Sequence, residues 1–124
     1  MAVFRGWAAT KAGGALERLD YDPGAIHPED VEITVEYCGV CHSDLAMVDS
    51  EWFAATYPLV PGHEVIGTVV AVGSQAKGRV LGQRVGLGWH SSSCCHCNFC
   101  LGGEQNLCTK RQPTIIGRHG GFAD

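Results

Sequence analysis

The feature that most constrains this chain is a run of cysteines between Ser91 and Cys108, which reads SSSCCHCNFCLGGEQNLC and holds five of the seven cysteines. Two intervening residues let consecutive thiolates turn back toward one centre, and a tetrahedral zinc ion accepts four sulfurs at about 2.3 Å. Cys95 follows Cys94 directly, so their side chains diverge and Cys95 is predicted not to bind. The sequence predicts a structural zinc lobe over residues 90–111. Its ligands in the spacing C-x2-C-x2-C-x7-C are Cys94, Cys97, Cys100 and Cys108.

The alternative for this stretch is a disulfide-rich segment, which needs an oxidising compartment. The N-terminus, MAVFRGWAATKAGG, has no basic start followed by an apolar run, so no secretory signal is predicted. No apolar stretch approaches the roughly 20 residues of a membrane span. We therefore expect a cytoplasmic protein, in which cysteine clusters favour metal over disulfides. The net charge is −4 and no Lys/Arg run exists, so neither nucleic acid nor a membrane is expected as a partner.

Strand patterns dominate the rest of the chain, which at 124 residues suits one domain, residues 1–124. Apolar side chains alternate from Val31 to Tyr37, which predicts a half-buried strand. The β-branched run from Glu64 to Gly73 predicts a strand that is buried on both faces or bulged at Gly67. Further short strands are expected at 4–10, 16–20 and 84–87, a helix near Cys41, and one helical turn in GGEQNLC. Strands and helices do not alternate in a βαβ pattern, so a mainly β, barrel-like chain without a Rossmann domain is predicted.

A second group of metal-binding residue types lies outside the cysteine run, in YCGVCHSD and PGHE. A C-x2-C pair is a moderate zinc signal, and a lone histidine is more often a hydrogen-bonded residue than a ligand. The four-cysteine loop has its own complete ligand set, however, so Cys41 and His63 remain available for a second site. Catalytic zinc sites use three protein ligands and leave one position for water or substrate. The sequence therefore indicates a second, open zinc site.

These segments together resemble the N-terminal, GroES-like catalytic domain of the zinc-dependent alcohol dehydrogenases, in the medium-chain dehydrogenase/reductase superfamily. CGVCHSD is similar to the family's catalytic-zinc cysteine segment. GHEVIGTVVAVGSQA matches the signature G-H-E-x2-G-x5-G-x2-A, and the four-cysteine loop resembles the structural-zinc lobe. Within this family, the sequence is most similar to the cinnamyl-type and related bacterial alcohol dehydrogenases. The resemblance implies a partly open β-barrel with a protruding zinc lobe.

The resemblance also implies roles for individual residues. Cys41 and His63 would bind the catalytic zinc, with Glu64 beside the metal as a further or transient ligand. Cys38 matches a position that is not a ligand. Asp44 would accept a hydrogen bond from the ligating imidazole and so fix its orientation.

Four more residues gain roles in the same way. Ser43 would pass the substrate proton, and His42 would lie near the cofactor pyrophosphate. Trp52 and Trp89 fall where the family lines its substrate pocket, although core packing is the ordinary role of tryptophan. Ala46 stands where many relatives have the histidine that ends the proton relay, so the proton is expected to leave through His42 or water.

Two parts of the family pattern are absent from the sequence. The third catalytic ligand and the nucleotide-binding domain would both follow residue 124, so we expect the chain to be a fragment. The resemblance implies that the full-length enzyme transfers hydride reversibly between a small alcohol or aldehyde and NAD or NADP, as a homo-oligomer. The isolated chain is expected to bind structural zinc without turning over substrate. Two alternatives stay open: a polyol- or threonine-type zinc dehydrogenase domain, and a zinc-organised interaction module without enzyme activity.

Overall fold

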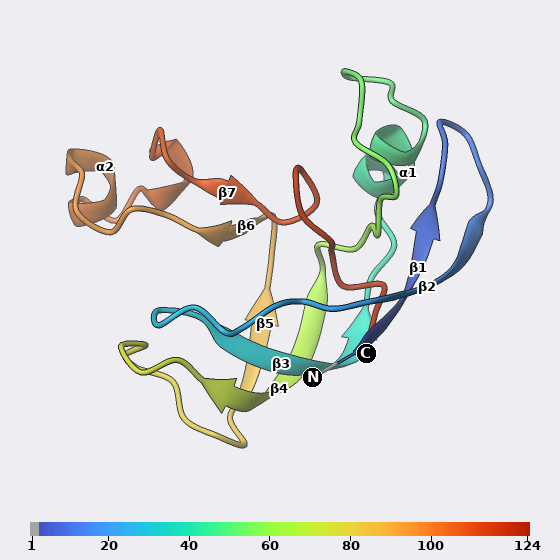
Figure 1. Ribbon diagram of the computed structural model, residues 1–124. Helices are drawn as coiled ribbons and strands as arrows, with labels where there is room; N and C mark the ends of the chain where they lie inside the picture. Colours follow the sequence, from blue (N-terminus) through green and yellow to red (C-terminus); the bar gives the residue numbers. More distant parts are fainter. Residues whose placement is uncertain (1–2) are drawn as a thin grey trace.

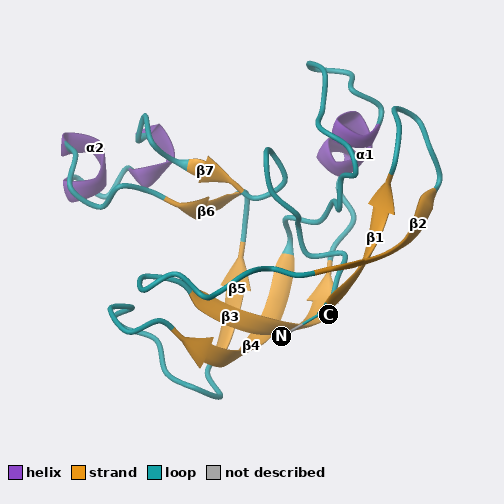
Figure 2. Ribbon diagram, in the orientation of Figure 1, coloured by secondary structure: helices purple, strands orange, loops and turns teal. Residues whose placement is uncertain are grey.

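The computed structural model describes residues 3–124 and is mainly β, as predicted. Loops connect most of the short elements (Figure 2). No helix among these residues has the length and apolarity needed to cross a membrane. The strands are β1 (Phe4–Ala9), β2 (Leu16–Tyr21), β3 (Val31–Cys38), β4 (Val65–Val72), β5 (Arg84–Leu87), β6 (His90–Ser92) and β7 (Gln112–Pro113). The helices are α1 (His42–Val48), α2 (Asn98–Leu101) and the 3-10 turn η1 (Gln105–Leu107).

The strands form three separate antiparallel ladders. β1 pairs with β2, β4 lies between β3 and β5, and β6 pairs with β7. In Figure 1 the β6–β7 pair carries α2 away from the β3–β4–β5 sheet, whereas α1 lies on the other side, above β1. The ladders curve around an open interior, and a separate lobe projects from them. The expected open β architecture with a protruding lobe is confirmed.

The central sheet departs from the predicted pattern at one end of β3. The register shifts between Val35 and Tyr37, which leaves Glu36 as an extra residue and Tyr37 69% exposed. Gly67 lies opposite Val35, and a Cβ on Gly67 would sit 2.4 Å from the carbonyl oxygen of Thr34. This bulge is therefore in β3, opposite the glycine, rather than at Gly67 itself. A second register shift, between Glu32 and Ile33, leaves Val70 as an extra residue in β4. β4 alternates buried and exposed residues in its first half, so the idea of a strand buried on both faces is wrong.

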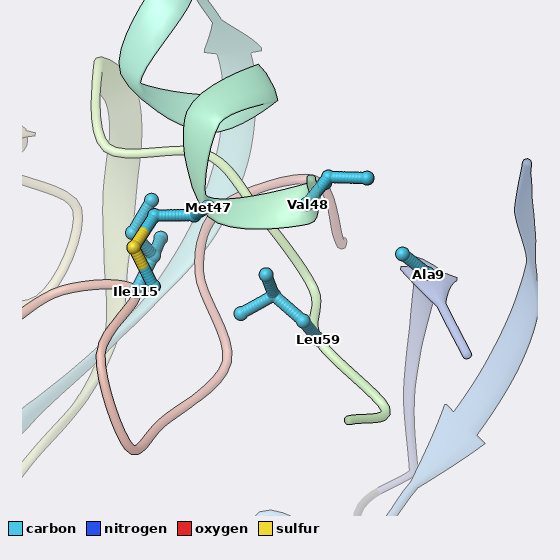
Figure 3. Close-up of a cluster of buried hydrophobic side chains, with 5 residues drawn as sticks. All are labelled: Ala9, Met47, Val48, Leu59 and Ile115. Atoms are coloured by element: carbon cyan, nitrogen blue, oxygen red, sulfur yellow. The ribbon is translucent and has the colours of Figure 1, made fainter. Parts of the chain in front are cut away.

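The core is small and joins segments that are distant in sequence. Figure 3 shows its five buried side chains gathered between α1, β1 and two loop segments. Strand β1 is tied to the chain before β4 because Ala9 and Leu59 exchange backbone hydrogen bonds of 2.8 and 2.9 Å. This packing fixes α1 relative to both the first strand and the C-terminal segment. The members are Ala9, Met47, Val48, Leu59 and Ile115.

Replacing Ile115 by alanine should destabilise the chain by about 2–5 kcal/mol, because the side chain is fully buried and its removal leaves a cavity. Urea unfolding followed by far-UV circular dichroism measures the change. Leu101→Ala, at a position 75% exposed, is the control and should change stability by less than about 0.5 kcal/mol. Equal effects of the two variants would contradict the core described above.

A partly buried histidine lies at the rim of the open interior. The rings of Tyr21 and His119 are 4.5 Å apart, and both line a groove of about 620 Å³ between the sheets. His119 Nδ1 is buried and has no hydrogen-bond partner among the described residues. Burial, followed by the charge of Arg118, lowers the pKa of His119 below its usual value. The folded state therefore favours the neutral ring.

This histidine should make the chain less stable in mild acid. A depressed folded-state pKa means that protonation favours unfolding, so stability is complete above the unfolded pKa of about 6.5 and falls as the pH drops through it. His119→Phe keeps a ring against Tyr21 and should lose less stability than the wild type between about pH 7.5 and pH 5. Urea unfolding at matched zinc content measures the difference. Parallel pH profiles for the two chains would contradict the prediction.

Candidate functional site

The lobe that carries the cysteine run is framed by β6 and β7. Ser91 Oγ donates a hydrogen bond of 2.9 Å to the carbonyl of Gln112, which joins the two short strands where the lobe begins and ends. Helix α2 starts after Cys97, whose sulfur accepts from the backbone N–H of Cys100 at 3.4 Å. For this lobe the sequence predicted a loop with one helical turn in GGEQNLC, and η1 (Gln105–Leu107) is that turn. The prediction missed α2, β6 and β7 because these elements are too short to show periodicity.

Four cysteine sulfurs of the lobe converge on one point. All lie within 4.8 Å of one another, and the Sγ atoms of Cys94 and Cys100 are 3.9 Å apart. A tetrahedron with metal–sulfur bonds of about 2.3 Å has edges of about 3.8 Å, so the arrangement fits a zinc ion. Cys95 lies outside the group, is exposed, and has φ +66°, which turns it toward Ser93. The converging residues are Cys94, Cys97, Cys100 and Cys108.

Hydrogen bonds to sulfur favour thiolates in part of this cluster. Hydrogen bonds to the Cys100 sulfur lower its pKa to about 6, and the bond from the Ser93 hydroxyl has the largest effect. The Cys100 backbone N–H also favours a thiolate at Cys97, but burial and the neighbouring sulfurs outweigh it and raise the pKa of Cys97 to about 11. The backbone N–H of Cys94 and that of Lys110 both donate to Cys108 Sγ, each at 3.4 Å. Four thiolates this close repel one another, so a bound dication is the group that would neutralise them.

The second cluster joins the start of α1 to the segment before β4. Cys41 is the residue that precedes α1, in an extended conformation, and His63 and Glu64 lie just before β4. One ligand atom of each of these three residues lies within 4.8 Å of the other two. His63 is buried, Cys41 is partly buried and Glu64 is exposed, so the cluster opens to solvent on one side. The structure thus brings together the three residues predicted for the open site.

A buried carboxylate holds this cluster in place. Asp44 is 3% exposed, and its Oδ2 accepts from the backbone N–H of Cys41 at 3.1 Å. Its Oδ1 accepts from the backbone N–H of Gly62 at 2.9 Å and lies 3.0 Å from His63 Nδ1. A carboxylate can only accept, so His63 carries its proton on Nδ1 and leaves Nε2 free to coordinate. The side chain predicted to orient the imidazole is placed to do so.

Two glycines shape the cluster, and the sequence reading did not identify either role. A Cβ on Gly39 would lie 2.2 Å from Glu64 Oε2, so glycine makes room for that carboxylate. Gly62 has φ +108°, and a Cβ there would approach Cys38 Sγ to 2.8 Å and Phe122 N to 2.7 Å. Phe122 and Cys38 come from distant parts of the chain, so only the folded structure reveals these restrictions.

Cys38 lies next to the cluster but does not belong to it. Burial raises the pKa of its thiol, although a hydrogen bond from the Glu64 backbone partly offsets the effect. Its sulfur donates weakly to the carbonyl of Gly39 at 3.6 Å. The neutral thiol agrees with its expected role as a residue that is not a ligand.

Two aromatic rings lie beside the cluster. Trp89 meets His63 edge-on with ring centroids 4.8 Å apart, and Trp52 meets Trp89 edge-on at 6.3 Å. Trp89 also packs against the buried core, whereas Trp52 is 52% exposed. Trp89 therefore packs on the core and also lies beside His63, and its role in a substrate pocket stays a prediction.

The remaining predicted residues lie on α1. Ser43 is partly buried in the first turn, and Ala46 is fully buried in the helix. The His42 side chain is 74% exposed, and its Nε2 lies 3.7 Å from Glu51 Oε2. An anionic neighbour works against a phosphate at His42, so Glu51 has to move aside if a pyrophosphate binds there.

Comparison with known proteins identifies the family of this chain. Residues 27–124 match the family model described as the alcohol dehydrogenase GroES-like domain. The chain is 52% identical over 122 residues to aldehyde reductase AdhA of Synechocystis, covering 98% of this chain and 36% of that protein. The solved cinnamyl alcohol dehydrogenase SbCAD4 of Sorghum bicolor superposes with a TM-score of 0.90 at 36% identity, covering 99% of this chain and 37% of that one.

A second solved structure, the cinnamyl alcohol dehydrogenase of Helicobacter pylori complexed with NADP(H), has a TM-score of 0.90 at 31% identity. The match covers 98% of this chain and 38% of that one. The chain thus spans a little over a third of the length of these relatives. Because the family model matches well over half of its residues, the chain belongs to the alcohol dehydrogenase GroES-like domain family.

Proposed function

We propose that this chain is the zinc-binding catalytic domain of an alcohol dehydrogenase or aldehyde reductase. The observation that carries the proposal is the convergence of Cys41, His63 and Glu64 around a buried carboxylate that fixes the imidazole tautomer. In a longer polypeptide with a nucleotide-binding domain, the reaction is reversible hydride transfer between an alcohol and NAD or NADP. The solved relative complexed with NADP(H) supports a nicotinamide cofactor.

Each residue at the open site has a distinct task in this proposal. When bound, zinc polarises the substrate oxygen and lowers the pKa of an alcohol. Cys41 Sγ and His63 Nε2 would hold the ion, with Glu64 as a third or transient ligand. Asp44 keeps the proton on His63 Nδ1, and Ser43 would take the proton that leaves the alcohol. Because Ala46 cannot relay that proton, His42 or water would carry it to solvent.

The substrate is a small alcohol or aldehyde with an apolar group. Trp89 lies edge-on to His63 and Trp52 edge-on to Trp89, and in this proposal both would contact that group, while Cys41, His63 and Glu64 would hold the zinc. His42 would meet the cofactor pyrophosphate once Glu51 moves away. The four-cysteine lobe, residues 90–111, would bind a second, structural zinc and serve the fold rather than the chemistry.

Cys100→Ser should remove the zinc of the lobe, because a hydroxyl is a poor replacement for one of four converging thiolates. Elemental analysis of protein purified without added metal should lose about one zinc per chain relative to the wild type, and the lobe should become more sensitive to proteolysis. Cys95→Ser is the matched control, because Cys95 neighbours the cage without joining it, and it should keep its zinc. Equal losses in both variants would contradict the assigned ligand set.

Asp44→Asn should weaken metal binding at the open site by about 10–100-fold, because the amide offers one acceptor oxygen where the carboxylate now serves three donors. In protein whose four-cysteine lobe is already filled with zinc, titration with Co²⁺ reports on the open site through the charge-transfer absorption of a cobalt–thiolate bond to Cys41. Glu29→Gln, which removes an exposed carboxylate outside both clusters, is the control. Unchanged cobalt affinity in Asp44→Asn would argue against the orienting role.

Activity is tested in the polypeptide that joins this domain to the remaining two-thirds of the length its relatives have. Reduction of aldehydes with NADH or NADPH is followed at 340 nm, and the polyols mannitol and sorbitol test the polyol alternative. We expect aldehyde reduction that falls by at least about 100-fold in Cys41→Ser. The isolated 124-residue chain should show no turnover. Full activity in Cys41→Ser, or turnover by the isolated chain, would contradict the proposal.

A further inference from the structure

Helix α1 ends in an arrangement that usually requires glycine. The backbone N–H of Glu51 donates to the carbonyl of Ala46 at 2.9 Å, and that of Ser50 donates to Met47 at 3.2 Å. These two bonds define a Schellman motif, in which the residue after the helix adopts a left-handed conformation. Ser50 holds that position with φ +53°. A side chain here is strained, so the serine hydroxyl should contribute something that glycine cannot.

The hydroxyl joins the helix end to a residue seven positions further on. Tyr57 Oη donates to the carbonyl of Val48 at 2.7 Å, and Ser50 Oγ lies 2.7 Å from Tyr57 Oη. A phenol has one hydrogen, which Val48 already accepts, so Ser50 is the donor to Tyr57. The backbone N–H of Ala55 then donates to Ser50 Oγ at 3.2 Å. We call this pair of hydroxyl groups, Ser50 and Tyr57, the hydroxyl clasp.

The clasp closes a loop that carries Trp52. Of the backbone N–H groups of residues 52–57, all within the described chain, one makes a hydrogen bond, and it is the bond from Ala55 to the clasp. Trp52 is half exposed and touches the site through the edge of Trp89. The clasp therefore provides the main hydrogen bonds that hold this loop, and Trp52 with it, beside the open metal cluster.

We propose that the hydroxyl clasp determines substrate size at this site. By fixing the loop, it fixes Trp52 edge-on against Trp89, whose ring lies beside His63, and so sets the room that these two indoles leave for a substrate there. A flat aromatic alcohol or aldehyde gains contact with the indole surface that stays free when the two rings are held edge-on, whereas a short aliphatic one gains little. Ser50 and Tyr57 are positioning residues that act through Trp52. This inference rests on the proposed function.

The position of Trp52 can be measured in the 124-residue chain with 5-fluorotryptophan and ¹⁹F NMR. The chain has three tryptophans, so Trp→Phe variants assign the three resonances, and Trp7 on β1 serves as the internal reference. Tyr57→Phe keeps the ring that packs on the core but loses the clasp. Ser50→Gly keeps the left-handed helix end but loses the hydroxyl. Tyr37→Phe, at an exposed tyrosine whose hydroxyl makes no hydrogen bond among the described residues, is the control.

We expect Tyr57→Phe and Ser50→Gly to shift and narrow the Trp52 resonance toward that of the free amino acid. Trp7 should stay unchanged in both, and Tyr37→Phe should resemble the wild type. An unchanged Trp52 resonance in both clasp variants would overturn the proposal. A shift in Ser50→Gly alone would also overturn it, because the backbone rather than the clasp would then position the loop.

Selectivity is measured on the same wild-type and variant chains, loaded with zinc, by titrating benzyl alcohol and 1-propanol. We expect the wild type to bind benzyl alcohol several-fold more tightly and the preference to fall toward one in Tyr57→Phe. A preference that survives in Tyr57→Phe would overturn the role in selectivity even if Trp52 moves. Failure of the wild type to bind either alcohol would instead contradict the proposed substrate site, and with it any role in selectivity. The Trp52 shift would then establish the clasp as a purely structural tie.

Discussion

The arrangement of the open site depends on one buried carboxylate. Asp44 accepts hydrogen bonds from the N–H of Cys41, the N–H of Gly62 and Nδ1 of His63. A buried charge is tolerated only where such donors replace water, and here the donors come from both segments that supply metal ligands. The same interaction therefore begins helix α1, anchors the chain before β4, and selects the imidazole tautomer. Cys41 and His63, which are 22 positions apart in sequence, meet because Asp44 binds both.

The two candidate metal sites are stabilised differently. The open site is built on the core, since α1 contributes Met47 and Val48 to the buried cluster, and Trp89 packs on the same cluster. The four-cysteine lobe has little apolar packing of its own: Phe99, Leu101 and Leu107 are all exposed. Its sulfurs are held by short elements and N–H···S bonds, so a bound ion would supply much of its stability. A lost ligand is therefore expected to unfold the lobe locally and to leave the core largely intact.

The end of helix α1 combines local strain with side-chain hydrogen bonds. The left-handed Ser50 is an unfavourable residue for the end of a helix, and glycine would fit better. Its hydroxyl nevertheless forms hydrogen bonds with the Tyr57 hydroxyl and the backbone N–H of Ala55. These bonds hold the loop of residues 52–57, whose backbone N–H groups make no other hydrogen bonds within the described chain. A strained residue that persists at the edge of a candidate site is a reason to look for a role, and the clasp provides one.

Much of the site could be predicted from the sequence because its signals are local. The spacing of the four lobe cysteines and the position of Cys95 correspond to the converging group in the structure. The strands at 84–87 and near the N-terminus, and the helix after Cys41, also match closely. The short elements α2, β6 and β7 were missed, and the bulge was expected at Gly67 but lies in β3. Strand pairing decides where an extra residue goes, and one sequence carries no direct signal of its partner.

The sequence by itself determined which residues could bind metal, because ligand type and spacing along a loop are local properties. It also determined the mainly β character, through alternation and β-branched runs. Only the tertiary structure decided how the ligands meet. The carboxylate of Asp44, the space left by Gly39 and Gly62, and the edge contacts of Trp89 all join segments that are distant along the chain. Such contacts depend on distances in the folded state, and these are fixed by packing and by register.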